Sequence, residues 1–155
     1  YPAGPLIDKY AREGKPVFDF VEPRIKNLDF SFSGLKTAIL YFLKRKIKEN
    51  PNFIQENLAD ICASVQARIV SILMNKLTKA STQTGIKQIA IAGGVSANSG
   101  LRAALQTQGA TLGWQTYIPQ IQYCTDNAAM IAMAGSFKYE KGIFVGQDVT
   151  PLARY

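Results

Sequence analysis

Histidine is absent from the 155-residue chain, and this absence excludes several kinds of chemistry. The chain by itself has no Ser–His or Cys–His nucleophile pair, no histidine acid or base, and no histidine-rich metal site. Cysteine is scarce as well: Cys62 and Cys124 lie far apart in the sequence and make no disulfide framework. Two distant cysteines are typical of a reducing compartment, so we predict a cytoplasmic protein.

Long hydrophobic runs and a signal-peptide pattern are also missing. No apolar run approaches the ~20 residues needed to cross a bilayer, and we therefore expect no membrane among the partners. The chain begins at Tyr1 without an initiator methionine, and we interpret it as a piece of a longer protein.

The composition is that of a folded domain with a basic surface. Apolar residues make up 47% of the chain and charged residues 19%, which excludes a disordered tail or a coiled coil. The length predicts a single domain over residues 1–155. With 18 Lys and Arg against 11 Asp and Glu, the net charge of +7 modestly favours a nucleic-acid partner.

Hydrophobic periodicity predicts an α/β protein dominated by helices. Helices are expected over residues 5–11, 35–47, 53–80, 101–105 and 127–141, and strands over residues 17–21, 28–32, 86–92 and 114–118. Gly109 is expected to close the fourth of these helices. The last strand–glycine turn–helix–strand sequence is a βαβ unit, which predicts a parallel strand pair with a right-handed crossover.

The turn Gly93-Gly94-Val95-Ser96-Ala97-Asn98 follows the predicted strand 86–92 directly. Two glycines let the backbone approach a ligand without a Cβ, and the next helix start offers free amide groups. This geometry suits a phosphate, a ribose or an adenine ring. A tight chain reversal without a ligand would use the same glycines, and the spacing matches neither a Walker A loop nor Gly-x-Gly-x-x-Gly. Both interpretations stay open at this point.

Asp126 lies immediately before the last predicted helix. It is either an N-cap that accepts amide hydrogens or a carboxylate that binds a metal or phosphate-linked ligand. One carboxylate is too few for a tight metal site, so further ligands would come from elsewhere. The neighbouring Cys124 has no base beside it in the sequence and is interpreted as a packed thiol, and Cys62 as a core residue.

Two further segments carry polar residues at the ends of the 35–47 helix. Lys44, Arg45, Lys46 and Lys48 near its end either complement the helix dipole or contact a phosphate backbone. The segment Phe30 to Thr37 at its start, with two hydroxyls, a glycine and Lys36, either caps the helix or binds an anion.

Four segments occur together in order: Tyr1-Pro2-Ala3-Gly4-Pro5, Phe30 to Thr37, Ile91 to Asn98, and Cys124 to Ala128. With their spacings they resemble the tRNA threonylcarbamoyladenosine transferase family, formerly named the O-sialoglycoprotein endopeptidases or glycoproteases. The resemblance covers nearly the whole chain and corresponds to the C-terminal half of the family's length. Each motif is weak by itself, and the four in register are a strong match.

The resemblance implies an actin/Hsp70/sugar-kinase-like fold, in which two ribonuclease-H-like lobes enclose a nucleotide cleft. This chain would form an incomplete lobe, helix-rich with a short mixed sheet. Gly93, Gly94 and Ser96 fall in that superfamily's adenosine motif, and Asn98 and Gly4 match substrate-binding positions of the family. Asp126 matches the aspartate that completes the family's metal site. Ser33, Gly34 and Lys36 fall in a signature near the cleft and receive no catalytic role.

The chemistry so implied is transfer of a threonylcarbamoyl group from threonylcarbamoyl-AMP to the adenosine next to the tRNA anticodon. The implied cofactor is one iron or zinc ion, which can polarise the carbonyl without a histidine base. The implied partners are tRNA and, in bacteria, a paralogous actin-like subunit and a P-loop ATPase. Lys44, Arg45 and Lys48 are the candidate tRNA contacts.

Two departures from the family pattern shape our expectations. Ala3 replaces the first glycine of the Tyr-Pro-Gly-Gly-Pro motif. The family's two metal-binding histidines belong to a His-x-x-x-His helix before the position of Tyr1, so Asp126 stands alone here. We therefore expect this polypeptide by itself to be inactive and metal-free, with no complete catalytic set, and its sheet to be short with an exposed edge.

Three alternatives remain beside the transferase. A non-catalytic actin-like scaffold subunit would share the fold, although retention of Asn98 and Asp126 weighs against it. A sugar-kinase or acetate-kinase type of enzyme would need an acidic base and phosphate loops in the other lobe. A metal-dependent glycoprotease would need a complete zinc site or a protease-like nucleophile.

Overall fold

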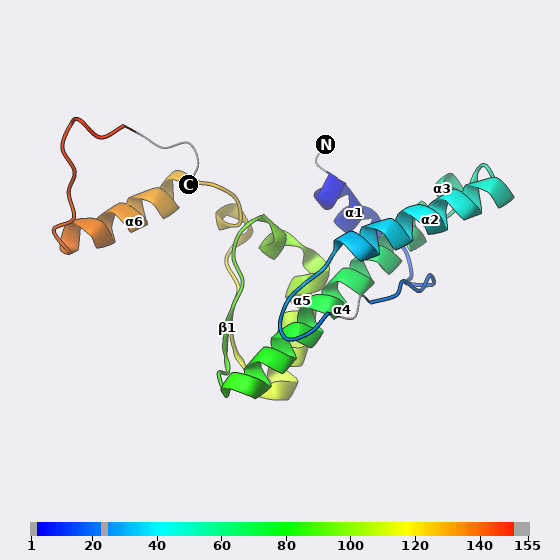
Figure 1. Cartoon of the computed structure of the whole chain (residues 1–155), viewed down its shortest axis with the longest axis horizontal. Helices are drawn as coiled ribbons and strands as arrows, with labels where there is room; N and C mark the ends of the chain where they lie inside the picture. Colours follow the sequence, from blue (N-terminus) through cyan, green and yellow to red (C-terminus); the bar gives the residue numbers. More distant parts are fainter. Residues whose placement is uncertain (1–2, 23–24, 151–155) are drawn as a thin grey trace.

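The computed structural model describes residues 3–22 and 25–150 of the chain (Figure 1). The described elements, in chain order, are α1 (Ala3–Ala11), α2 (Ser33–Glu49), α3 (Phe53–Glu56), α4 (Leu58–Thr84), β1 (Gln88–Ala90), the 3₁₀ turn η1 (Gly94–Ala97), α5 (Ser99–Leu112), β2 (Gln115–Tyr117), the 3₁₀ turn η2 (Ile121–Tyr123) and α6 (Ala128–Glu140). The predicted helix-dominated α/β composition is confirmed, and Tyr1 and Pro2 of the first motif lie outside the described residues.

Helix α4 is the central element, and its apolar stripe serves two separate cores. Toward its end it packs with α5 and the strands in a cluster of Met74, Ile89, Leu101, Leu105 and Trp114. Toward its middle it packs with α2 and the segment before it in a cluster of Phe20, Leu35 and Ile72. Burial of this stripe from both sides explains why the longest periodic pattern of the sequence forms the longest helix.

Helix α4 also has the length and mean hydropathy of a membrane span, although the sequence contains no long uninterrupted apolar run. One such helix among the described residues is weak support for a membrane, because the core helix of a folded domain passes the same test. The two clusters cover part of its apolar surface, with Ile72 and Met74 buried in them.

The helix predicted over residues 53–80 is interrupted at Asn57, which separates α3 from α4. The Asn57 side chain donates from Nδ2 to the carbonyl of Phe53 at 2.9 Å, and such local bonds compete with regular helix geometry. At the other end α4 continues to Thr84 and stops at Gly85, whose left-handed φ of 71° is a common helix end.

The strands predicted over residues 17–21 and 28–32 are wrong: both segments are irregular. The aromatics of the first segment pack onto a helix instead, whereas Phe30 and Phe32 of the second stack on each other. Phe18 and Phe20 lie 5.2 and 5.3 Å from the Phe42 ring, between ring centroids. The Phe18 amide donates to the Ser64 hydroxyl of α4 at 3.0 Å, so its backbone is satisfied without a partner strand.

The predicted βαβ unit is confirmed in outline. Strands β1 and β2 pair in parallel with Ile89 opposite Thr116, and α5 connects them. The short sheet is confirmed, whereas the expected mixed sheet is corrected: the described strands form a two-stranded parallel sheet. With two strands, each has an outer edge without a strand neighbour among the described residues.

The prediction that Gly109 closes the helix that contains it is wrong. Helix α5 runs on to Leu112 and ends at Gly113, where φ is 66°. A Cβ on Gly109 would come within 2.7 Å of the Thr116 methyl group. Gly109 therefore allows the helix to lie close against β2, which is a packing role that local sequence does not distinguish from a stop.

Helix α6 is confirmed within a residue of its predicted start and end, and Figure 1 shows it projecting away from α4 and α5. Its large apolar side chains are exposed, among them Met130, Ile131, Met133 and Phe137. Residues 143–150 form no regular element, in line with the irregular tail expected there.

Candidate functional site

The site lies where β1 and β2 end. Because the strands are parallel, their carboxyl ends share one edge, and the segments that follow them meet there. The amide of Ile91 donates to the carbonyl of Tyr117 at 3.1 Å, which extends the pairing one residue toward that edge. The glycine turn follows β1, and the Cys124–Asp126 segment follows β2 by way of η2.

The glycine turn has an open backbone, as its sequence indicated. Gly93 has a left-handed φ of 76°, which favours glycine over any other residue. A Cβ built on Gly93 or Gly94 would meet no atom within 4 Å, so no side chain covers this bend in the described structure. The turn is held from beneath by Ser96, whose buried hydroxyl donates to the Gly93 carbonyl at 2.7 Å.

Asn98 caps the helix that follows the turn. Its Oδ1 accepts from the amide of Leu101 at 2.9 Å, a regular N-cap bond. Its Nδ2 donates to Oε1 of Gln66 on α4 at 2.7 Å. Retention of Asn98 is thus explained by helix capping even without a ligand, which removes one of the two arguments raised against a scaffold.

Asp8 is the residue at this site that sequence reasoning missed. It is buried on α1, and its Oδ1 accepts from the amide and hydroxyl of Ser99 at 3.0 and 2.7 Å. Its Oδ2 accepts from Arg12 Nη2 at 2.7 Å. The four-residue spacing of Asp8 and Arg12, which is typical of an ion pair along a helix, was the local sequence signal for a role of Asp8.

The protonation of Asp8 follows from these contacts. Burial alone would raise the pKa of this carboxyl group. Hydrogen bonds from Ser99, Arg12 and, most weakly, Gln66 outweigh burial and hold the pKa of Asp8 below its ordinary value. Asp8 is therefore an anion at neutral pH, placed at the positive end of α5.

Gly4 lies one turn before Asp8 and so on the same face of α1. A Cβ there would meet no atom within 4 Å. Since Asp8 bonds to Ser99, the structure brings this face of α1 to the start of α5 and to Asn98.

The two segments at the sheet edge are joined by Arg102 of α5. Its Nη1 donates to the Ser96 carbonyl at 3.0 Å and lies 3.9 Å from the Cys124 sulfur. Cys124 is buried, as expected of a packed thiol. Cys62 is also buried, and burial raises the pKa of its thiol. Arg102 thus places the segment that carries Asp126 beside the glycine turn.

Asp126 is exposed and forms no hydrogen bond or ion pair with the residues that the structure describes. The N-cap of α6 is Asn127, whose Oδ1 accepts from the Met130 amide at 3.0 Å, so the capping interpretation of Asp126 is wrong. Within residues 3–22 and 25–150, no group of three His, Cys, Asp or Glu side chains gathers as a metal site.

The basic residues of α2 divide into two sets. Lys44, Arg45 and Lys48 are exposed. Lys46 instead donates to Glu49 at 2.7 Å, and this bond lowers the pKa of the Glu49 carboxyl group. The first three remain candidates for a phosphate backbone, whereas Lys46 is engaged within its own helix.

The N-cap of α2 is Phe32, which offers no side-chain cap; its backbone carbonyl accepts from the Lys36 amide at 2.9 Å. Lys36 lines an apolar groove of about 590 Å³ between α1, α2 and α4, which also reaches Val95 of the glycine turn. The groove is not polar enough for a phosphate, so the Ser33–Lys36 segment gains no anion site from it.

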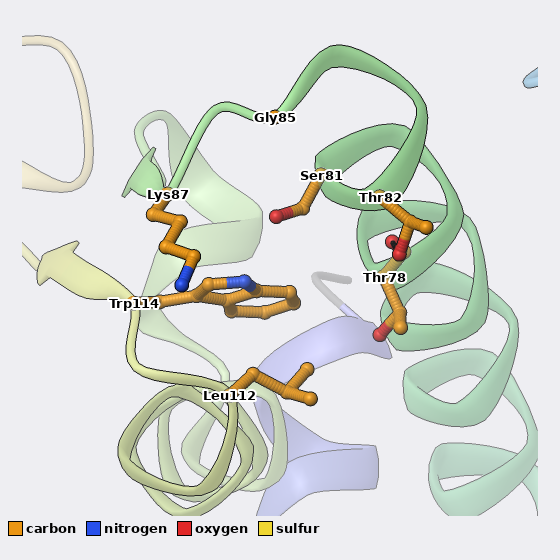
Figure 2. Close-up of a pocket in the computed structure, with 7 residues that line it drawn as sticks. All are labelled: Thr78, Ser81, Thr82, Gly85, Lys87, Leu112 and Trp114. Carbon is orange, nitrogen blue, oxygen red and sulfur yellow. Dashed lines mark hydrogen bonds between the residues drawn. The ribbon is translucent and has the colours of Figure 1, made fainter.

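A second hollow, of about 250 Å³, lies beyond the other end of the strands (Figure 2). Figure 2 shows Lys87 and the Trp114 indole on one side and hydroxyls of α4 on the other. The Ser81 hydroxyl donates to the Ile86 carbonyl at 2.7 Å and that of Thr82 to the Thr78 carbonyl at 2.9 Å. These groups hold the helix end and the following loop.

The parallel strands, the bare glycine turn and the carboxylates at one edge define an α/β protein with a candidate ligand site at its strand ends. Its sequence matches the model of the family described as tRNA N6-adenosine threonylcarbamoyltransferase over residues 1–133. The chain belongs to this family.

Individual relatives agree. A tRNA N6-adenosine threonylcarbamoyltransferase of Riemerella anatipestifer is 54% identical over 156 residues, covering 100% of this chain and 46% of its own length. The protein of the same name from Christiangramia forsetii is 55% identical with the same coverage. That from Cytophaga hutchinsonii is 52% identical over 99% of this chain and 45% of its own length. The chain spans about half the length of these relatives.

Proposed function

We propose that this chain is the adenosine-binding portion of an enzyme that transfers the threonylcarbamoyl group of threonylcarbamoyl-AMP to the adenosine next to the anticodon of tRNA. The observation that carries the proposal is the uncovered Gly93–Gly94 backbone at the carboxyl edge of a parallel strand pair, in a chain of this family. An adenylate can lie against such backbone without steric conflict.

The proposed architecture is an actin-like one. Residues 1–155 form one domain that is the C-terminal part of a two-lobed, ribonuclease-H-like enzyme. The two-stranded parallel sheet with α4 and α5 packed on it is compatible with part of such a lobe.

In the reaction, the exocyclic amine of the tRNA adenosine attacks the threonylcarbamoyl carbonyl carbon, and the bond to the AMP phosphate oxygen breaks to release AMP and a proton. Gly4 and Asn98 bind the substrate, with the backbone of Gly93, Gly94 and Ser96 beside the adenosine. These residues contribute positioning, which converts a bimolecular reaction into an oriented one.

The described residues alone do not fit an iron or zinc site, because Asp126 is a single carboxylate without neighbouring ligands among them. We therefore propose Asp126 only as one ligand of a site completed by two histidines from outside this chain. By itself this polypeptide would lack both metal and activity.

The proposed setting is the cytoplasm, with tRNA as substrate and, in bacteria, a paralogous actin-like subunit and a P-loop ATPase as partners. A non-catalytic scaffold is the second candidate, and the capping role of Asn98 is the observation that favours it.

Asn98 provides the test, because capping and ligand binding can be separated there. Asn98→Ser keeps a good N-cap and removes the amide donor, whereas Asn98→Ala removes both. In the full-length protein both variants are expected to weaken AMP binding about 10-fold, the value of one lost hydrogen bond. Calorimetric titration with AMP, with GMP as the control nucleotide, measures the affinity.

Stability separates the two roles. Only Asn98→Ala is expected to lower the free energy of unfolding, by about 1 kcal/mol. If Asn98→Ser binds AMP as the parent does, Asn98 is a helix cap only, and the scaffold function is favoured.

For the tRNA partner, the triple change Lys44→Ala, Arg45→Ala, Lys48→Ala is expected to weaken tRNA binding. Each lost phosphate contact reduces the slope of log K against log salt by roughly 0.7–0.9, so a total reduction of about 2–3 is expected. Binding at several salt concentrations measures it. Lys46→Ala is the matched control on the same helix, since Lys46 already pairs with Glu49. An unchanged slope in the triple variant would leave these residues as helix-end charges.

A further inference from the structure

Three elements meet at the start of α5. Asp8 on α1 accepts from the Ser99 amide and hydroxyl. Beside it, a row of hydrogen bonds links the Gln66 amide on α4, the Asn98 amide and the Leu101 backbone amide. Gln66 begins this row and is half-buried. None of the motifs considered in the sequence includes Gln66.

The row has one direction, because the Gln66 amide group turns its oxygen toward Asn98. That oxygen accepts from Asn98 Nδ2 at 2.7 Å. The Asn98 oxygen is then left to accept from Leu101 at 2.9 Å. If either side-chain amide were turned around, a hydrogen-bond donor would face another donor. The orientation of each amide therefore fixes that of the other.

Space around the row is adapted to the same arrangement. A Cβ on Gly100 would come within 2.9 Å of Gln66 Nε2 and 3.4 Å of Asn98 Oδ1. Glycine at this position leaves room for the Gln66 side chain to reach Asn98 across the first turn of α5.

The number of hydrogens on Asn98 then limits what a ligand can meet. Nδ2 carries two hydrogens, and one of them is donated to Gln66. The second hydrogen is the remaining donor of the side chain. A ligand atom that binds this hydrogen must be a hydrogen-bond acceptor.

We propose that Gln66 is a positioning residue that fixes the Asn98 amide so that it presents one N–H to an acceptor atom of the adenine nucleotide. This inference rests on the proposed function, since it needs Asn98 to contact the nucleotide. Gln66 itself acts through Asn98 and touches no reacting atom.

Gln66→Met tests this positioning role, since methionine has a similar length but forms no hydrogen bonds of comparable strength. In the full-length protein the dissociation constant for AMP is expected to rise about 5–10-fold. Gln108→Met is the matched control: Gln108 also joins α5 to α4, donating to Thr78 Oγ1 at 2.9 Å. It is expected to alter thermal stability without changing AMP affinity.

A double-mutant cycle distinguishes positioning from general destabilisation. In an Asn98→Ser background, Gln66→Met is expected to change AMP affinity less than twofold, because the donor that it orients is gone. The same fold-change in both backgrounds would overturn the proposal, as would unchanged affinity for Gln66→Met alone. If Asn98→Ser by itself leaves AMP binding unchanged, the proposed function fails first, and the proposal fails with it.

Should Gln66→Met not fold, Gln66→Asn serves the same test. Its amide is one methylene shorter, so the group stays polar but no longer reaches both partners. It is expected to weaken AMP binding by a similar factor, and parental affinity in this variant would overturn the positioning role.

Discussion

Replacement of Asp8 with alanine is expected to lower the free energy of unfolding by about 2–4 kcal/mol. The cost arises mainly at Ser99, whose amide and hydroxyl lose their acceptor at the start of α5. Arg12 contributes less, because 64% of its side chain is exposed and it returns to water easily. Urea denaturation of the full-length protein at pH 7 measures the change.

The same residue predicts a pH dependence. Because hydrogen bonds hold the pKa of Asp8 below its unfolded value of about 3.9, its contribution is fully present above about pH 4. It is lost as the pH falls through the lower pKa of the folded state. The stability difference between the parent and Asp8→Asn should therefore shrink as the pH falls below about 4.

Asp29→Asn is the control for this series, since Asp29 is exposed and has no hydrogen-bond partner among the described residues. It is expected to leave the urea midpoint at pH 7 unchanged. A constant difference between the parent and Asp8→Asn down to pH 2 would show that the Asp8 charge is not used in the fold.

The helices and the βαβ unit could be predicted because their signals are local. The apolar stripe of α4 repeats over many turns, and the strand before Gly93 is a compact apolar run. Family resemblance in four ordered segments was confirmed by the family match over residues 1–133. Neither prediction depends on contacts between residues that are distant in the sequence.

The two false strands show where local signals stop. Alternation at Phe18 and Phe20 is satisfied by aromatic contacts with Phe42, which lies on the following helix, α2. A strand also needs a partner strand, and a period of two does not show whether one exists. The prediction that Gly109 ends a helix is wrong for a similar reason, since the role of this glycine depends on its contact with Thr116 of β2.

The candidate site was predictable in part. Glycines that leave backbone bare can be recognised from sequence, and Gly93 has the left-handed φ that requires one. The partners of Asn98 could not be predicted, because Gln66 lies 32 residues away and Asp8 reaches Ser99 across 91 residues. Such bonds are set by the packing of α1 and α5 on α4.

That packing depends most on Leu105, and its replacement with alanine is expected to cost about 2–5 kcal/mol of unfolding free energy. The Leu105 side chain has 0% exposure and lies among Met74, Ile89, Leu101 and Trp114, where helices α4 and α5 meet β1. A cavity at this point cannot be filled by water, since all of these neighbours are apolar.

Leu112→Ala, on the same helix but 36% exposed, is the matched control and is expected to cost less than about 1 kcal/mol. Chemical denaturation of the full-length protein compares the two. A loss for Leu105→Ala no larger than that for Leu112→Ala would mean that α5 does not pack on α4 as described. The positions of Asn98, which caps α5, and of Arg102 on α5 would then lack their support, and so would the site.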